Sequence, residues 1–256
     1  MFSTTEITSH EIASDNPIHQ RLFFAYHQAS QMIKGDILEI GCGVGRGLAV
    51  ILEKSGTYTA VDKNGKLIEK LQIEYPNHRF ITHHIPPLES LEDNTFDYVI
   101  TFQVIEHIEN DDLFVKEIHR VLKPHGKAFI STPNIKQSLT RNPWHIREYT
   151  ADGLEKLMKK YFSKLETYGV DGNEKVMQYH AENRKSVAKF KKLDIFNLEK
   201  HLPRWALQIP YDFLNRFNRK KLMQNENSLS SQISHTDYFL SNTPDKALDL
   251  FYIAEK

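Results

Sequence analysis

The chain has 256 residues, of which 40% are hydrophobic, so it can form one α/β domain with an elaboration, or at most two small domains. Its 33 Lys and Arg balance 33 Asp and Glu, which excludes an overall field that would attract nucleic acid or a membrane. The single cysteine excludes an intrachain disulfide. The N-terminus lacks the basic start and apolar core of a signal peptide, and no apolar run approaches the about 18 residues of a membrane span. We therefore expect a soluble, cytoplasmic protein.

A helix is predicted over residues 15–34. Asp15-Asn-Pro17 is typical of a helix start, and the apolar residues after it recur at helical spacing. We expect this helix to lie across the mouth of the site that the next segment forms.

The segment from Ile37 to Gly47 predicts a strand, a glycine-rich turn and then a helix that ends at Ser55-Gly56. Gly41, Gly43 and Gly45 remove Cβ atoms where the backbone must bend and approach a ligand closely. The helix that follows directs its first N–H groups and its positive dipole end at that ligand. This arrangement favours a carboxylate or a phosphate.

The spacing of these glycines separates two classes of ligand. A dinucleotide fingerprint, G-x-G-x-x-G, would place its third glycine at position 46, where this chain has Arg46. The spacing therefore disfavours a nicotinamide-dependent oxidoreductase. That function stays open as an alternative, as does an ordinary glycine-rich turn.

Two further strands are predicted to end near the glycine-rich turn. Tyr58-Thr-Ala-Val-Asp62 predicts a strand that ends in an acid, and Arg79-Phe-Ile-Thr-His83 predicts the next one. Ligands of open parallel sheets bind at the carboxyl ends of the strands, so we expect Asp62 beside the glycines, where it can accept both ribose hydroxyls. The alternative role of Asp62 is to cap the helix predicted over 65–73.

The fourth and fifth strands are predicted over 96–102 and 127–131. The fourth is apolar throughout, as a buried parallel strand should be. The helix Asp111–Leu122 connects them, and its apolar residues form one face. Polar residues that follow these two strands are therefore expected at the same edge of the sheet as Asp62.

The C-terminal part contains a helix at 150–160, a sixth strand at 162–169 and a last strand at 248–253. About seventy residues separate these two strands, far more than a hairpin loop needs, so they must form a structure of their own. Residues 184–221 carry eleven Lys and Arg against three Asp and Glu, a net charge of +8, with apolar residues interleaved. Pro203 and Pro210 predict short helices there. We expect a helical cap with a solvated basic face; the alternative is a docking surface for an anionic or amphipathic substrate, with peripheral membrane contact through 184–221.

The segment Glu39-Ile-Gly41-Cys-Gly43-Val-Gly45 resembles motif I of the class I S-adenosylmethionine (SAM) methyltransferases. Segments starting at Phe96, Val104, Arg120 and Ser131 are similar to later motifs of that superfamily and follow in its order. The resemblance covers roughly residues 35–170 and the last strand. It implies SAM as the cofactor, and the cofactor-binding residues are Glu39, Gly41, Cys42, Gly43, Gly45, Asp62 and Gln103. After the third strand the family often has an acid for the adenine amino group; here residues 83–87 are His-His-Ile-Pro-Pro.

The same resemblance implies an α/β fold: a Rossmann-like, doubly wound sheet of seven mostly parallel strands with an antiparallel last strand and a helical insertion. In these terms residues 1–170 and 246–256 form the SAM-binding domain, and 171–245 form the helical cap.

Methyl transfer to a hydroxyl requires a base or a metal, because the acceptor must lose its proton. Glu106, His107 and His145 are the candidate catalytic residues, since they follow the fourth and fifth strands. The pattern Gln103-x-x-Glu106-His107 is similar to the metal-binding E-x-x-E-H of small-RNA 2′-O-methyltransferases and of quinone-biosynthesis O-methyltransferases. Gln103 replaces the first acid, which removes one negative charge from a divalent-metal site. A metal-free role as base or positioning residue is therefore favoured, no metal ligands are assigned, and either histidine could instead be packed in a core.

The sequence thus predicts a SAM-dependent methyltransferase that acts on a small or lipid-like acceptor, with oxygen as the methylated atom. A catalytically silent SAM-binding or scaffold protein is the alternative, because Gln103 departs from the family pattern. Nucleic acid is disfavoured as a partner, since the basic segment is rich in apolar residues and no RNA-binding motif accompanies it. The sequence assigns neither the identity of the acceptor nor an oligomeric state.

Overall fold

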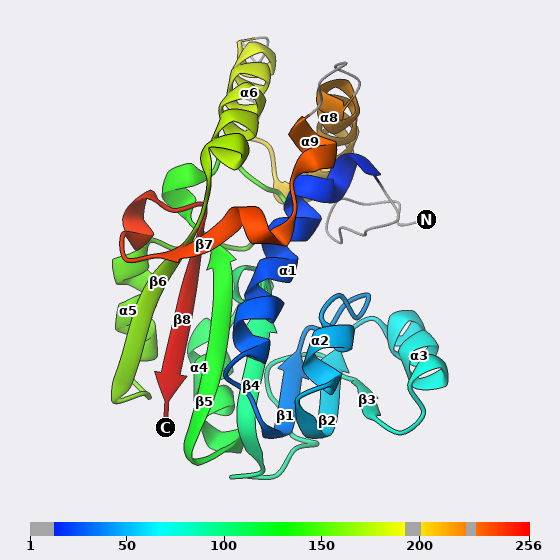
Figure 1. The fold of residues 1–256 in the computed structure, drawn as a ribbon, viewed down its shortest axis with the longest axis vertical. Helices are drawn as coiled ribbons and strands as arrows, with labels where there is room; N and C mark the ends of the chain where they lie inside the picture. Colours follow the sequence, from blue (N-terminus) through cyan, green and yellow to red (C-terminus); the bar gives the residue numbers. More distant parts are fainter. Residues whose placement is uncertain (1–12, 193–200, 224–228) are drawn as a thin grey trace.

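The computed structural model describes residues 13–192, 201–223 and 229–256. Its centre is an eight-stranded sheet in the order β3-β2-β1-β4-β5-β8-β6-β7 (Figure 1). Strands β1 to β6 run in one direction, and β7 and β8 run antiparallel to them. The strands are β1 (Gly35–Ile40), β2 (Ser55–Asp62), β3 (Arg79–Thr82), β4 (Phe96–Phe102), β5 (Leu122–Pro133), β6 (Lys164–Gly172), β7 (Tyr238–Ser241) and β8 (Asp249–Glu255).

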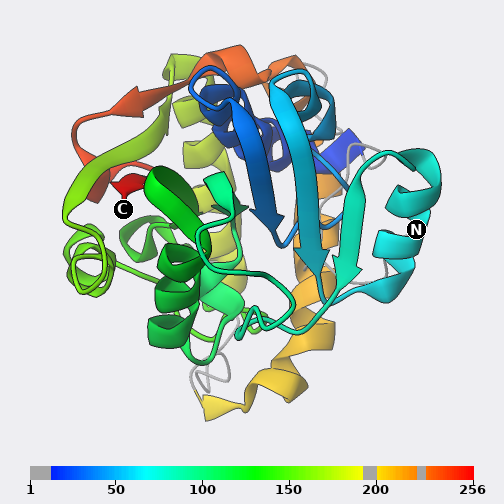
Figure 2. The ribbon, with the colours of Figure 1, turned by 90° about the horizontal axis from the view of Figure 1, so that it is seen from below.

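Helices cover both faces of this sheet (Figures 1 and 2). One core joins the sheet to α4 and α5, and a second core joins its other face to α1, α2 and α3. Successive strand residues alternate between these cores: Ile37 lies in the second core and Leu38 in the first, as the two-residue period of a strand requires. The helices on these faces are α1 (Asn16–Ser30), α2 (Leu48–Leu52), α3 (Gly65–Glu74), α4 (Asp111–Val121) and α5 (Ala151–Met158).

The long segment between β6 and β8 is largely helical. It contains α6 (Glu174–Lys191), α8 (Arg204–Met223) and α9 (Leu229–Gln232), which lie together beyond the carboxyl ends of the central strands (Figure 1). Residues 193–200 and 224–228 of the predicted insertion lie outside the described residues.

The predicted α/β fold is confirmed, with several differences in detail. The sheet has eight strands instead of seven, because β7, inside the predicted insertion, pairs antiparallel with β6. The prediction that Pro210 separates two short helices is wrong, since α8 continues through it. The N-terminal helix, predicted to reach residue 34, ends at Ser30. Ser55-Gly56, predicted to end the helix after the glycine-rich turn, forms the start of β2.

The helix α1 is held against the glycine-rich loop by Tyr26. The hydroxyl of Tyr26 donates to Glu39 Oε1 at 2.7 Å, and its ring packs edge-on against Phe102. A Cβ atom built on Gly47 would lie 1.9 Å from Tyr26 Cδ1, a distance at which something must move. A glycine at position 47 therefore lets α1 pack closely on the loop.

We expect Gly47→Ala to lower the free energy of unfolding by about 1–3 kcal/mol, the usual cost of overpacking a core. Urea titration measures the change. Gly65→Ala is the control, because its Cβ would meet Thr82 at 3.4 Å, an ordinary contact, and should leave stability unchanged or slightly higher. Equal stability of Gly47→Ala and the unmodified protein would contradict the close packing of α1.

Candidate active site

Two adjoining cavities lie at the carboxyl ends of the central strands. The first, the glycine-loop cavity, has a volume of about 660 Å³ and is lined by residues that follow β1, β2, β3 and β4. The second, the polar cavity, has a volume of about 260 Å³ and lies between the sheet edge and the helices α1, α6 and α8. Leu22, Gln103 and His107 line both, so the cavities meet at these residues.

The glycine loop is tied to the end of β2 by one carboxylate. Asp62 accepts the backbone N–H of Gly43 at Oδ2 and that of Asn64 at Oδ1, each at 2.8 Å. Gly43 has a φ of +52°, and a Cβ added there would meet open space. The cap of α3 is Asn64, whose side chain accepts the N–H of Leu67, so Asp62 does not have that alternative role.

Gly41, Cys42, Gly43, Asp62 and Gln103 all line the glycine-loop cavity. Two other residues predicted to bind the cofactor lie elsewhere. The carboxylate of Glu39 is buried between the hydroxyls of Tyr26 and Tyr58, and burial raises its pKa. Gly45 packs on the side chains of Leu48 and Leu71, which a Cβ would meet at 2.5 and 2.9 Å. The roles predicted for Glu39 and Gly45 stay predictions, and the structure places both residues behind the cavity wall.

Six polar residues that line the glycine-loop cavity were not predicted as site residues: Tyr26, Arg46, Lys63, His84, Glu109 and Asn110. Arg46 is largely buried, which lowers its pKa, and its guanidinium contacts the ring and the carbonyl oxygen of His19. The sequence offered a signal for Lys63, which follows Asp62 directly. Arg46 had no such signal, because in the sequence it stands out only where it interrupts the dinucleotide spacing.

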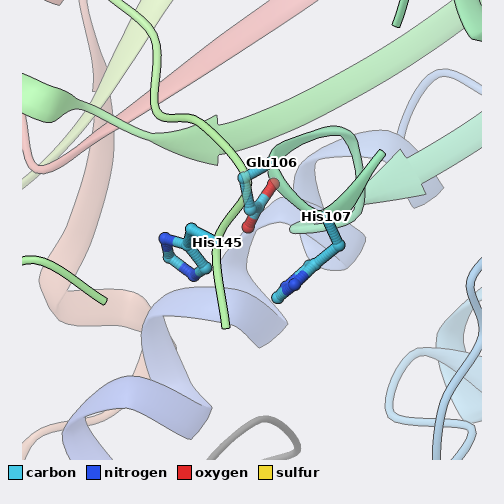
Figure 3. Close-up of side chains that lie close together, drawn as sticks. All are labelled: Glu106, His107 and His145. Carbon is cyan, nitrogen blue, oxygen red and sulfur yellow. The ribbon is translucent and has the colours of Figure 1, made fainter. Parts of the chain in front are cut away.

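The three predicted catalytic residues come together at the junction of the cavities. One potential ligand atom from each of Glu106, His107 and His145 lies within 4.8 Å of the others. Figure 3 shows the Glu106 carboxylate between the two rings, whose centroids are 5.0 Å apart. Glu106 and His107 belong to a short 3-10 helix after β4, and His145 comes from the loop after β5.

Glu106 is almost completely buried, and its Oε2 accepts a hydrogen bond from Thr132 Oγ1 at 2.9 Å. Burial raises the pKa of Glu106 to about 7, against the lowering effects of His145 and of the hydrogen bonds. The carboxyl group is therefore close to half ionised near neutral pH. It forms part of the wall of the polar cavity.

The hydrogen bonds of the two histidines define their tautomers. His107 Nδ1 lies 2.9 Å from the carbonyl oxygen of Trp144, which can only accept, so the neutral ring has its basic lone pair on Nε2. The backbone N–H of Trp144 donates to Asn142 Oδ1, which turns the Asn142 amide nitrogen toward His145 Nε2 at 2.8 Å. The amide N–H donates and His145 Nε2 accepts. His145 Nδ1 therefore carries the proton of the ring and donates to Glu148 Oε1 at 2.7 Å.

This arrangement fits a divalent metal poorly. The spacing of Glu106, His107 and His145 would suit an ion, but both ring nitrogens of His145 already hold hydrogen bonds. A metal would have to displace the amide of Asn142 or the carboxylate of Glu148. Together with the uncharged Gln103, these bonds favour a site in which the histidines move protons and position groups.

The rest of the polar cavity contains buried charges that are already paired. Arg21 Nε lies 3.0 Å from Asp249 Oδ2, and Arg219 Nη1 lies 2.9 Å from Asp15 Oδ1. Burial, with nearby arginines, lowers the pKa of His180 to about 4, so its ring is neutral at pH 7. The cavity therefore offers many hydrogen-bonding groups and little net charge.

Comparison with known proteins gives the family. The sequence model of a methyltransferase domain matches residues 38–130. A probable S-adenosylmethionine-dependent methyltransferase of Mycolicibacterium smegmatis is 33% identical over 174 residues, which are 65% of this chain and 67% of that protein. The chain belongs to the class I SAM-dependent methyltransferases.

Other relatives agree with this family. A ubiquinone biosynthesis O-methyltransferase of Rickettsia typhi is 34% identical over 46% of this methyltransferase and 47% of its own length. The methyltransferase thus spans about half the length of that relative. The fold is shared with a crystal structure of a SAM-dependent methyltransferase from Thermotoga maritima, described as a possible histamine N-methyltransferase, with a TM-score of 0.58, 14% identity and coverage of 93% and 91% of the two chains. SAM is the cofactor of this family, which removes the nicotinamide alternative.

The raised pKa of Glu106 predicts how the stability of the methyltransferase depends on pH. The folded state holds the proton up to about pH 7, whereas the unfolded chain loses it near 4.5, so burying Glu106 destabilises the fold progressively as the pH rises between these values. Glu106→Gln removes that titration. We expect the variant to gain about 3 kcal/mol over the unmodified protein at pH 8 and nothing near pH 4.5, at about 1.4 kcal/mol per pH unit.

Denaturant titrations at a series of pH values measure this difference. Glu53→Gln is the matched control, because it makes the same change of side chain on the exposed surface. A difference between Glu106→Gln and the unmodified protein that stays constant from pH 4.5 to pH 8 would contradict the raised pKa.

Proposed function

We propose that this methyltransferase transfers the methyl group of SAM to an oxygen atom of a small or lipid-like acceptor bound in the polar cavity. The observation that supports the proposal is the junction of the two cavities at Gln103 and His107. A cofactor in one cavity and an acceptor in the other would face each other there. In-line displacement at a sulfonium methyl requires this relation.

The glycine-loop cavity suits the parts of SAM in order. The methionine end of SAM would contact the backbone of Gly41, Cys42 and Gly43. The guanidinium of Arg46 lines the same cavity and would attract the carboxylate of SAM. Asp62 would accept the ribose hydroxyls with the lone pairs that its two backbone hydrogen bonds leave. Residues 84–86 would border the adenine in place of the missing acid.

The acceptor hydroxyl must lose a proton while it attacks the methyl group. We assign this proton to His107 Nε2, because Nδ1 already carries the proton that bonds the Trp144 carbonyl oxygen. The nearby Glu106 would stabilise the imidazolium that forms, since its carboxylate lies beside the ring. His145 would position the acceptor from the other side, with its orientation held by Glu148 and Asn142. SAM supplies an already activated methyl group, so the protein contributes orientation, a dry site and a base.

Oxygen is favoured as the methylated atom for two reasons. The proton acceptors gather where the cavities meet, and a hydroxyl needs such groups more than an amine does. The name of the Rickettsia typhi relative refers to an O-methyltransferase. The polar lining from Asn134, Tyr179 and Tyr211 would hydrogen-bond the polar part of the acceptor.

The test is to incubate the protein with methyl-labelled SAM and an extract of small molecules and lipids, and to follow labelled products by mass spectrometry. We expect a product that carries the label on oxygen. His107→Asn can still donate to Trp144 but has no ring base, so the rate should fall about 10²- to 10⁴-fold. Calorimetry should show SAM affinity within a few-fold of the unmodified protein, because most cofactor contacts remain.

Several results would count against the proposal. Label on nitrogen or carbon would exclude O-methylation, and undiminished turnover by His107→Asn would exclude His107 as the base. No product in any extract would favour the silent SAM-binding alternative. Activity that is lost in excess chelator and restored by Mg²⁺ would replace the base mechanism with a metal-assisted one.

A further inference from the structure

The helix α8 has its polar side toward the protein. Asn218 is buried, accepts the Ser186 hydroxyl at 2.6 Å and donates to Asn183 Oδ1 at 2.7 Å, which joins α8 to α6. The next residue of the helix, Arg219, pairs with Asp15. Side chains of this inner face also line the polar cavity: Tyr211, Asn215, Asn218 and Arg219.

The outward side of the same helix is apolar. Trp205, Ile209, Phe213 and Phe217 recur every fourth residue, which places them along one stripe of a helix with 3.6 residues per turn. Their exposed fractions lie between 52% and 82%. We call these four residues the outer stripe. A surface helix of a globular protein normally has the opposite arrangement, with the apolar stripe against the core.

Basic residues flank the outer stripe at both ends of α8. Lys220 and Lys221 follow it and are exposed, Arg204 precedes it, and Asp212 is the one acid of α8. Asp212 accepts a hydrogen bond from the Trp144 indole at 3.0 Å, so it faces the protein. Residues 184–221 carry a net charge of +8 in a chain whose total is zero. An apolar stripe with a basic border matches a surface that is apolar inside and anionic outside.

A membrane is such a surface. No helix among the described residues is long and apolar enough to cross a bilayer, so the contact would be made by a helix that lies in the plane of the interface. Contiguous exposed apolar side chains of this kind mark interaction sites, whereas single ones are common on any protein. Ile73 on α3 is such a single case, with an exposed fraction of 76%.

We propose that the outer stripe docks α8 on anionic phospholipid membranes, with the aromatic and aliphatic side chains among the acyl chains and Lys220 and Lys221 on the headgroups. Because the inner face of α8 lines the polar cavity, docking would hold that cavity next to the bilayer. The enzyme could then take a lipid-like acceptor from the interface. That consequence rests on the proposed function, whereas the docking itself does not.

Vesicle sedimentation tests the docking without SAM or an acceptor. The full-length protein should bind phosphatidylglycerol-containing vesicles, bind pure phosphatidylcholine vesicles much less, and dissociate as the salt concentration rises. The double variant Ile209→Ser/Phe213→Ser removes two large exposed side chains and should weaken binding roughly a hundredfold. Ile73→Ser is the matched control, with equal exposure on a helix away from α8, and should bind like the unmodified protein (Figure 1).

Two further measurements sharpen the test. Trp205 fluorescence should shift to shorter wavelength on anionic vesicles, and Lys220→Glu/Lys221→Glu should weaken binding to anionic vesicles while its circular dichroism stays unchanged. Absence of binding, equal loss with Ile73→Ser, or full binding by the double variant would each overturn the proposal. A concentration-dependent dimer in ultracentrifugation that the double variant abolishes, without vesicle binding, would show that a second copy of the chain covers the stripe instead. Since no turnover is measured, docking can fail while O-methylation succeeds, and the reverse.

Discussion

The Asp62 carboxylate is the point on which the site depends. By accepting the N–H groups of Gly43 and Asn64, it fixes the loop after β1 to the end of β2 and sets the floor of the glycine-loop cavity. The loop takes this path because glycine adopts positive φ at positions 41, 43 and 45 without strain. Tyr26 and Glu39 then hold α1 on the other side of the loop. Together, a carboxylate, a bend without side chains and one helix give the cavity its shape.

The acceptor side is built by a different principle. The polar cavity has walls of paired charges and amide side chains, which α1, α6 and α8 bring together. Burying such groups is costly unless each finds a partner, and the bonds of Asn218 and the pair of Arg219 with Asp15 meet that requirement. When the side of a helix that faces the protein is polar, few of its apolar residues can pack in the core. In α8 the four residues of the outer stripe face outward, and that reversal gives both the cavity lining and the exposed apolar side chains.

Much of the fold could be predicted from the sequence because its signals are local. The apolar run of β4, the acid at the end of β2 and the glycines after β1 each specify a conformation within a few residues. The convergence of Glu106, His107 and His145 followed from parallel topology alone, since strands that run together end at one edge. The hydrogen bonds of the two histidines could not be predicted from the sequence. Their partners, Trp144, Asn142 and Glu148, are brought into place only by the folded loop after β5.

Other features are set by long-range contacts that no local pattern carries. The four residues of β7 form a strand only because β6 offers an edge. The sequence shows apolar residues interleaved with basic ones over 184–221, but this pattern could not say whether those apolar residues face a core or solvent. Pro210 lies on the exposed side of α8, where the helix can continue with one hydrogen bond fewer, so a proline was a poor boundary signal.

The central claim is that the cofactor and acceptor meet at Gln103 and His107. A crystal structure with S-adenosylhomocysteine, the demethylated product of the cofactor, tests it most directly. We predict its ribose hydroxyls within hydrogen-bond distance of Asp62 and its sulfur facing the junction beside His107. A sulfur that points away from His107, or a product bound outside the glycine-loop cavity, would contradict the account.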